Sequence, residues 1–228
     1  MVTCKGRKKD GAPCGSPIVL ENGYCRAHQG QAGEVKTEEE PERWTRERLE
    51  AAIAEHGGPE GLDLAGTALS NLDLEEMDLH GIVLCHWDKE SRTRVVANLQ
   101  GAKLWSANLQ GAFLRGINLR RADLWDAKLQ KANLRDADLQ EASLEHANLQ
   151  EAALLVANLQ EAILMGANLR KARLESANLR GAKLGGANLQ ETNLTGARLQ
   201  EADLEDADLR GASCEGVNLL KLRYSSFQ

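Results

Sequence analysis

Leucine stands at every fifth position from Leu99 to Leu209, in all 23 of these positions. The residue two positions earlier is alanine in 21 of them, and the exceptions are Ile117 and Thr192. Since roughly one residue in ten is leucine in an ordinary chain, chance does not produce this regularity. A strict internal period is the sequence signature of a repeat architecture, and it takes precedence over local propensities.

The period of five excludes the two common secondary structures. On an α-helix each step of five turns the chain by about 500°, so the leucines would be spread over every face. On a flat strand an odd step changes sides each time, so half of them would face water. A chain that bends once per five-residue unit, here called a pentad, sends every alanine and leucine inward. The sequence therefore predicts a solenoid around an Ala/Leu axis.

The pentads resemble those of the pentapeptide-repeat family, whose unit is close to Ala-(Asn/Asp)-Leu-X-X. Examples are Ala-Asn-Leu-Gln-Gly at 97–101 and Ala-Asp-Leu-Arg-Gly at 207–211. The resemblance covers roughly residues 62–224 and implies an all-β solenoid, a right-handed β-helix of square (quadrilateral) cross-section with four pentads per coil. On that basis the β-helix domain, residues 59–228, contains about eight coils. Asparagines before the leucines are interpreted as structural, because their side chains can bond to the corner backbone.

The repeat is interrupted over residues 85–96. Leu84 keeps the register, but the next two positions are Lys89 and Arg94. A cation in a dry interior is costly unless it is paired, so we expect this segment to leave the coil as a loop. The alternative is two degenerate pentads that keep the path of the coil.

The N-terminal segment, residues 1–30, does not contain the five-residue repeat. Cys4, Cys14, Cys25 and His28 have the ligand types of a closed structural zinc site. The segment also resembles small knuckles with three Cys and one His ligand at the ends of other bacterial domains. So short a segment buries little apolar surface, and bound zinc would supply its folding energy. The alternatives are unrelated thiols or a disulfide, which an intracellular chain disfavours.

The same segment carries a net charge of +3. It could contact nucleic-acid phosphates, but such charges are usually a solvated surface, which is the preferred interpretation.

A linker at 31–40 leads to a helix predicted within 41–58, which Gly57, Gly58 and Pro59 end. Because a β-helix has open strand edges at its two ends, we expect this helix to cap the first coil. An independent partner-binding helix is the lesser alternative. The chain ends on large apolar residues, so the C-terminal end either folds over the last coil or meets a second copy; the resemblance favours a homodimer. These residues are Leu219, Leu220, Leu222, Tyr224 and Phe227.

Composition and motifs point away from an enzyme and from a membrane protein. The five histidines are scattered, and no nucleophile–base set or phosphate loop can be assembled. No stretch approaches the ~20 apolar residues of a membrane span, and the N-terminus lacks the apolar run of a signal peptide. The expected location is the cytoplasm. Function is then expected on the outer surface, through a protein partner.

Candidate interaction residues are aromatic or large apolar side chains at outer positions. With four pentads per coil, residues twenty apart stack, so Trp105, Trp125 and Met165 share one column. Packing of the two tryptophans under the 85–96 loop, or over a corner, is the alternative. The other candidates are Trp87, Phe113 and Leu155. Exposed aromatic residues often mark protein contacts.

Two function classes remain: a non-catalytic scaffold that binds another macromolecule, and a DNA mimic that binds DNA gyrase. The second is implied by the resemblance, since part of the family looks like B-form DNA in width and charge and shields gyrase. Mimicry needs an acidic surface. The chain has a net charge of −6, but residues 97–228 are neutral overall, so the charge favours the scaffold.

Overall fold

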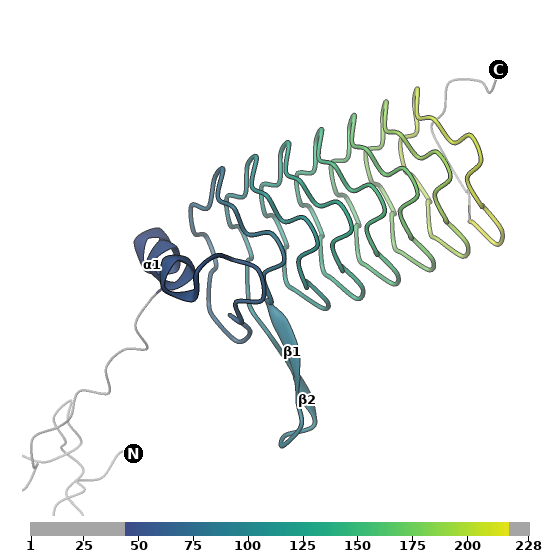
Figure 1. Ribbon diagram of the computed structural model, residues 1–228. Helices are drawn as coiled ribbons and strands as arrows, with labels where there is room; N and C mark the ends of the chain where they lie inside the picture. The colour runs from purple at the N-terminus through teal and green to yellow at the C-terminus, as the bar shows by residue number, and fades with distance from the viewer. Residues whose placement is uncertain (1–43, 219–228) are drawn as a thin grey trace, which may run out of the picture. The chain divides into compact units, whose positions relative to one another are not determined.

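The computed structural model describes residues 44–218, which form a short helix followed by a four-sided coil (Figure 1). Every leucine of the pentads from Leu99 to Leu199 is at most 1 % exposed. The alanines two residues earlier are at most 2 % exposed. The interior is therefore the continuous Ala/Leu column that the period of five predicts.

Each coil contains four pentads. From Asn98 to Arg198, the residue before each leucine forms a parallel bridge to the residue twenty positions later, as in Asn118 to Asp138 and Asp138 to Asn158. The backbone N–H groups of the leucines donate to carbonyl groups of the next coil. For example, the N–H of Leu119 donates to the carbonyl of Asp138 at 2.8 Å. Two of the four ladders link eight residues, one from each coil, and the other two link seven. The expectation of about eight coils, which depended on the family resemblance, agrees with this count.

Residues 85–96 leave the coil as an antiparallel β-hairpin (Figure 1). Strand β1 (Cys85–Asp88) pairs with β2 (Thr93–Val96), and Cys85 lies opposite Val96. The N–H of Ala97 donates to the carbonyl of Leu84 at 2.8 Å, the bond that closes an ordinary corner of the coil. The hairpin is therefore inserted inside one corner. Bridges that cross the insertion span thirty residues, as in Val83 to Phe113.

Each corner needs a residue in the left-handed backbone region. Its second residue has a positive φ, as in Gly116 (φ 71°) and Val156 (φ 59°). Asparagine supports the corner: Asn148 Oδ1 accepts from the N–H of Gln150 at 3.1 Å and from Asn168 Nδ2 at 3.2 Å. The asparagines are thus structural, in turns of the Asx type that stack from coil to coil.

Thr192 shows how the column accepts an exception to alanine. The side chain is completely buried, and its Oγ1 donates to the carbonyl of Leu169 at 2.7 Å. Because the hydroxyl has a partner, burying it avoids the cost of an unsatisfied polar group.

Helix α1 (Arg46–His56) lies at the N-terminal end of the coil (Figure 1). It begins later than the predicted residue 41, because the Thr45 side chain accepts from the N–H of Arg48 and caps the helix. Gly57, with φ 84°, ends it. Leu49 is 1 % exposed and belongs to the same core cluster as the first leucines of the coil, and Trp44 and Ile53 pack against that cluster.

Several predicted features lie outside the described residues. They are the zinc-knuckle segment, the linker at 31–40 and the C-terminal residues from Leu219.

Candidate functional site

One corner of the coil carries the aromatic column, and we name it the tryptophan corner. Its backbone is hydrogen-bonded directly from coil to coil. The N–H of Glu76 donates to the carbonyl of Trp105, the N–H of Ser106 to the carbonyl of Trp125, and the N–H of His146 to the carbonyl of Met165. The stacking expected for Trp105, Trp125 and Met165 is therefore present. The tryptophan corner consists of residues 75/76, 105/106, 125/126, 145/146, 165/166, 185/186 and 205/206.

The aromatic rings of the tryptophan corner contact one another. The ring centroids of Trp105 and Trp125 are 5.4 Å apart with planes tilted by 51°, and His146 meets Trp125 edge-on at 6.0 Å. A Cβ at Gly166 would come within 2.7 Å of His146 Nδ1, so this glycine leaves space for the imidazole. His146 was not among the sequence candidates, although its position next to Glu145 in the same column could have indicated it.

The tryptophan corner is acidic. Its seven pairs of residues hold six carboxylates and no lysine or arginine. These carboxylates belong to Glu75, Glu76, Asp126, Glu145, Glu205 and Asp206. The corner that follows it along the chain differs: Lys131 lies 3.9 Å from Glu151, and Arg170 and Lys171 both contact Glu191. Acid and base are therefore paired there, whereas one sign of charge dominates the tryptophan corner.

The hairpin extends from another corner, which we name the hairpin corner and which continues through 115/116, 135/136 and 155/156. Two pentads of a four-pentad coil separate it from the tryptophan corner, so the two corners are diagonally opposite. The alternative in which Trp105 and Trp125 pack under the 85–96 loop is therefore wrong. Trp87 of β1 is 59 % exposed.

The hairpin is held to the coil by contacts at its base. His86 Nδ1 lies 2.8 Å from Asp63 Oδ2, and Arg94 Nη1 lies 3.5 Å from Asp136 Oδ2. Cys85 Sγ donates to the carbonyl of Phe113 at 3.6 Å, and burial raises the pKa of this thiol. The base of the hairpin is thus a docked part of the coil.

The remaining sequence candidates are not gathered in one place. Phe113 projects from the flat face before the hairpin corner and is 51 % exposed. Leu155 lies in the hairpin corner itself and is half-buried, while its neighbour Val156 is 58 % exposed. The structure therefore separates the tryptophan corner from the apolar residues around the hairpin.

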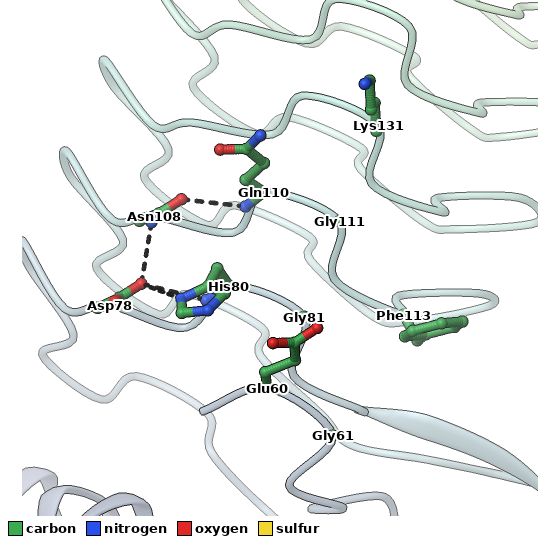
Figure 2. A pocket seen from close by; sticks show the side chains of 10 residues that line it. All are labelled: Glu60, Gly61, Asp78, His80, Gly81, Asn108, Gln110, Gly111, Phe113 and Lys131. Atoms are coloured by element: carbon green, nitrogen blue, oxygen red, sulfur yellow. Dashed lines mark hydrogen bonds and ion pairs between the residues drawn. The ribbon is translucent and has the colours of Figure 1, made fainter. Parts of the chain in front are cut away.

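A groove of about 740 Å³ lies near the first coils (Figure 2). Figure 2 shows Asp78 bonded to His80 and to Asn108 at its edge, both at 2.9 Å. Burial raises the pKa of Asp78, but the hydrogen bonds from His80 and Asn108 outweigh it, so this pKa lies below its ordinary value. The residues that line this groove include no serine, threonine or cysteine, the usual nucleophiles, beside the His80–Asp78 pair.

The predicted zinc ligands Cys4, Cys14, Cys25 and His28 lie outside the described residues. Within residues 44–218, no group of three potential ligands is placed to hold a metal ion. In the same part of the chain, no helix has the length and apolarity that crossing a bilayer requires.

These features define the class: a right-handed quadrilateral β-helix built from pentads. A family model described as pentapeptide repeats matches in eight copies between residues 97 and 219. The chain belongs to the pentapeptide repeat family. A second model, described as a domain of unknown function (DUF5763), matches residues 2–39.

Solved structures of other pentapeptide repeat proteins match parts of this chain. A trypsin-treated variant of QnrB1, a plasmid-mediated fluoroquinolone resistance protein, is 21 % identical over 73 % of this chain and 84 % of its own, with a TM-score of 0.48. HetL from Nostoc sp. strain PCC 7120, involved in heterocyst differentiation regulation, is 27 % identical over 78 % and 95 %, with a TM-score of 0.33. The Nostoc PCC 7120 protein alr5209 is 38 % identical over 47 % and 84 %, with a TM-score of 0.33. A comparison with curated protein sequences gave no match.

Proposed function

We propose that this chain is a non-catalytic scaffold that binds another protein through the outer surface of its coil and its hairpin. The observation that carries the proposal is the contrast between inside and outside. The interior is a column of buried leucine and alanine, and packing at ordinary density offers no cavity for a substrate. The exterior exposes Trp87, Phe113 and Met165 by 59, 51 and 45 %. Side chains of these types are enriched in protein interfaces.

Site-specific photo-crosslinking tests the proposal. A photoreactive residue replaces Trp87, Phe113 or Trp105 in the native host, and Arg198 serves as an exposed control position on a flat face that does not adjoin the tryptophan corner. We expect at least one of the three positions, and not position 198, to give a covalent adduct with one defined protein. That protein, once purified, then binds the wild-type chain more tightly than the matching alanine variant. Absence of a position-dependent adduct contradicts the proposal.

A DNA mimic that binds DNA gyrase is a second candidate, and the six carboxylates of the tryptophan corner are the observation that favours it. Basic side chains on the other corners, such as Arg121, Lys131 and Arg170, oppose it, since they repel a basic groove. A gyrase supercoiling assay with and without a quinolone separates the two. Protection or inhibition of gyrase at micromolar protein favours the DNA mimic, and the absence of any effect excludes it.

A further inference from the structure

The tryptophan corner combines an aromatic platform with one sign of charge. Trp105 and Met165 are 39 and 45 % exposed, and Trp125 is half-buried between Trp105 and His146. Backbone bonds between successive coils hold the backbone of these residues in register. The ring contacts of Trp105, Trp125 and His146 restrict these three side chains, so they lose less conformational freedom when a ligand contacts them.

Five of the six carboxylates beside this platform are available to a ligand. Across residues 44–218, no ion pair involves Glu75, Glu76, Asp126, Glu145 or Glu205. The two flat faces that adjoin the corner carry three lysines. Lys103, whose Nζ lies 3.7 Å from Asp73 Oδ2, and Lys183 belong to one face, and Lys128 belongs to the other. The corner therefore has an excess of negative charge that the coil does not neutralise.

Aromatic faces and carboxylates together recognise guanidinium groups. A guanidinium is planar and weakly hydrated, so it can stack on an indole while it donates hydrogen bonds to a carboxylate. The chain already contains one such stack, because Arg48 Cζ lies 4.8 Å from the centre of the Trp44 ring. An ammonium group is more strongly hydrated and stacks less well.

We propose that the tryptophan corner is the docking surface for an arginine-rich, extended segment of a partner protein. The proposal rests on the proposed scaffold function and names the site and the chemistry of its partner. Six coil-to-coil steps separate Glu75 from Glu205. At ~4.8 Å per step they span about 29 Å, which is the length of about nine residues of extended chain. The hairpin, on the diagonally opposite corner, stays free for other contacts.

A labelled peptide of nine arginines tests the proposal by fluorescence anisotropy with the full-length chain, beside a peptide of nine lysines. We expect the arginine peptide to bind more tightly. We expect two double variants, Trp105→Ala/Trp125→Ala and Asp126→Asn/Glu145→Gln, each to weaken its binding by about tenfold. Circular dichroism shows whether the coil stays folded, and the charge variant removes no packed side chain.

Matched variants elsewhere on the coil control for net charge and for loss of an aromatic ring. Glu161→Gln/Glu201→Gln removes the same two charges from a different corner, and Phe113→Ala removes an exposed ring from a flat face. Both are expected to change binding less than twofold. Equal weakening by the Glu161/Glu201 variant, or equal binding of the two peptides, overturns the proposal. Corner-dependent binding of a DNA duplex in place of the peptide overturns it as well.

The crosslinking experiment distinguishes this proposal from the scaffold function. A defined protein adduct at Trp87 that survives all tryptophan-corner variants, together with no binding of the arginine peptide, refutes the docking surface and leaves the scaffold function standing. An adduct at Trp105 that the arginine peptide displaces supports both.

Discussion

Arg94 of the hairpin lies directly over Gly116 of the coil: a Cβ at Gly116 would come within 2.9 Å of Arg94 Nη1. The same guanidinium nitrogen lies 3.5 Å from Asp136 Oδ2. The missing side chain at Gly116 thus makes the space in which Arg94 reaches its carboxylate. The hairpin is docked through a long flexible side chain, which can shift at low cost when that space is filled.

The Gly116→Ala variant is therefore expected to loosen the hairpin in addition to destabilising the coil. Alanine at φ 71° costs about 1 kcal/mol, and displacing Arg94 adds the small value of an exposed ion pair. We expect trypsin to cleave faster after Lys89 and Arg92 than in the wild type. Mass spectrometry of the fragments over time measures the cleavage rate. Gly111→Ala is the matched control, because its φ is 68° and a Cβ there meets nothing within 4 Å. Equal cleavage rates in the two variants contradict the docking role of Arg94.

Val156 is a β-branched residue in the left-handed backbone region, at φ 59° and 58 % exposed. A β-branched side chain is strained there, and its exposure means that little packing compensates. We expect Val156→Gly to raise the free energy of unfolding by about 0.5–1 kcal/mol, because relief of strain exceeds the extra freedom of glycine in the unfolded chain. Urea denaturation measures the change.

Val83→Gly is the control for that substitution. Val83 bridges Asp63 and Phe113 in a flat ladder, where its φ is not positive and no strain is relieved. The same change is therefore expected to destabilise the coil by about 1 kcal/mol. Destabilisation by both variants would show that Val156 contributes more packing than strain.

The period of five predicts much of this fold, and its limits have physical causes. It requires one bend per pentad, and it locates the insertion, since Lys89 and Arg94 could not enter the column. It does not contain the angle of each bend, so four pentads per coil depended on the family resemblance. The start of α1 at Arg46 depends on the hydrogen bond of the Thr45 side chain, which a pattern of apolar residues does not record.

The candidate site was predictable only in part. A step of twenty residues places Trp105 over Trp125, but the edge-on contact of His146 depends on the space that Gly166 leaves. Likewise, the diagonal separation of Trp87 from the tryptophan corner follows from the corner in which the hairpin is inserted. Side-chain contacts between coils are set by local shape, to which the repeat pattern is insensitive.

Zinc in the N-terminal segment stays a prediction, and substitution of one expected ligand tests it. If Cys4, Cys14, Cys25 and His28 enclose the metal, the purified wild-type chain contains about one zinc ion, and Cys25→Ser loses most of it because a closed site needs all four ligands. Elemental analysis of the metal measures the loss. Cys214→Ser, which changes an exposed thiol at a leucine position of the coil, is the control. Equal zinc in the two variants would refute the site.

Asp78 gives the coil a pH dependence whose sign follows from its hydrogen bonds. Its pKa is lowered, so the carboxylate contributes stability above the unfolded pKa of about 3.9, and the contribution is lost as the pH falls through the folded pKa. Asp78→Asn keeps the acceptor of the His80 N–H but removes the charge. It is expected to lower the free energy of unfolding at pH 6 by less than about 1 kcal/mol, since the pair is exposed.

The difference between the wild type and Asp78→Asn should shrink as the pH falls from 6 to 3, as measured by urea unfolding at each pH. Combining the change with His80→Gln tests the cause. If the charge acts through His80, Asp78→Asn has a smaller effect on stability at pH 6 in the His80→Gln background than in the wild type. A difference that is the same in both backgrounds would assign the effect to the two donors that His80→Gln leaves in place, Asn108 Nδ2 at 2.9 Å and the backbone N–H of residue 80 at 3.3 Å.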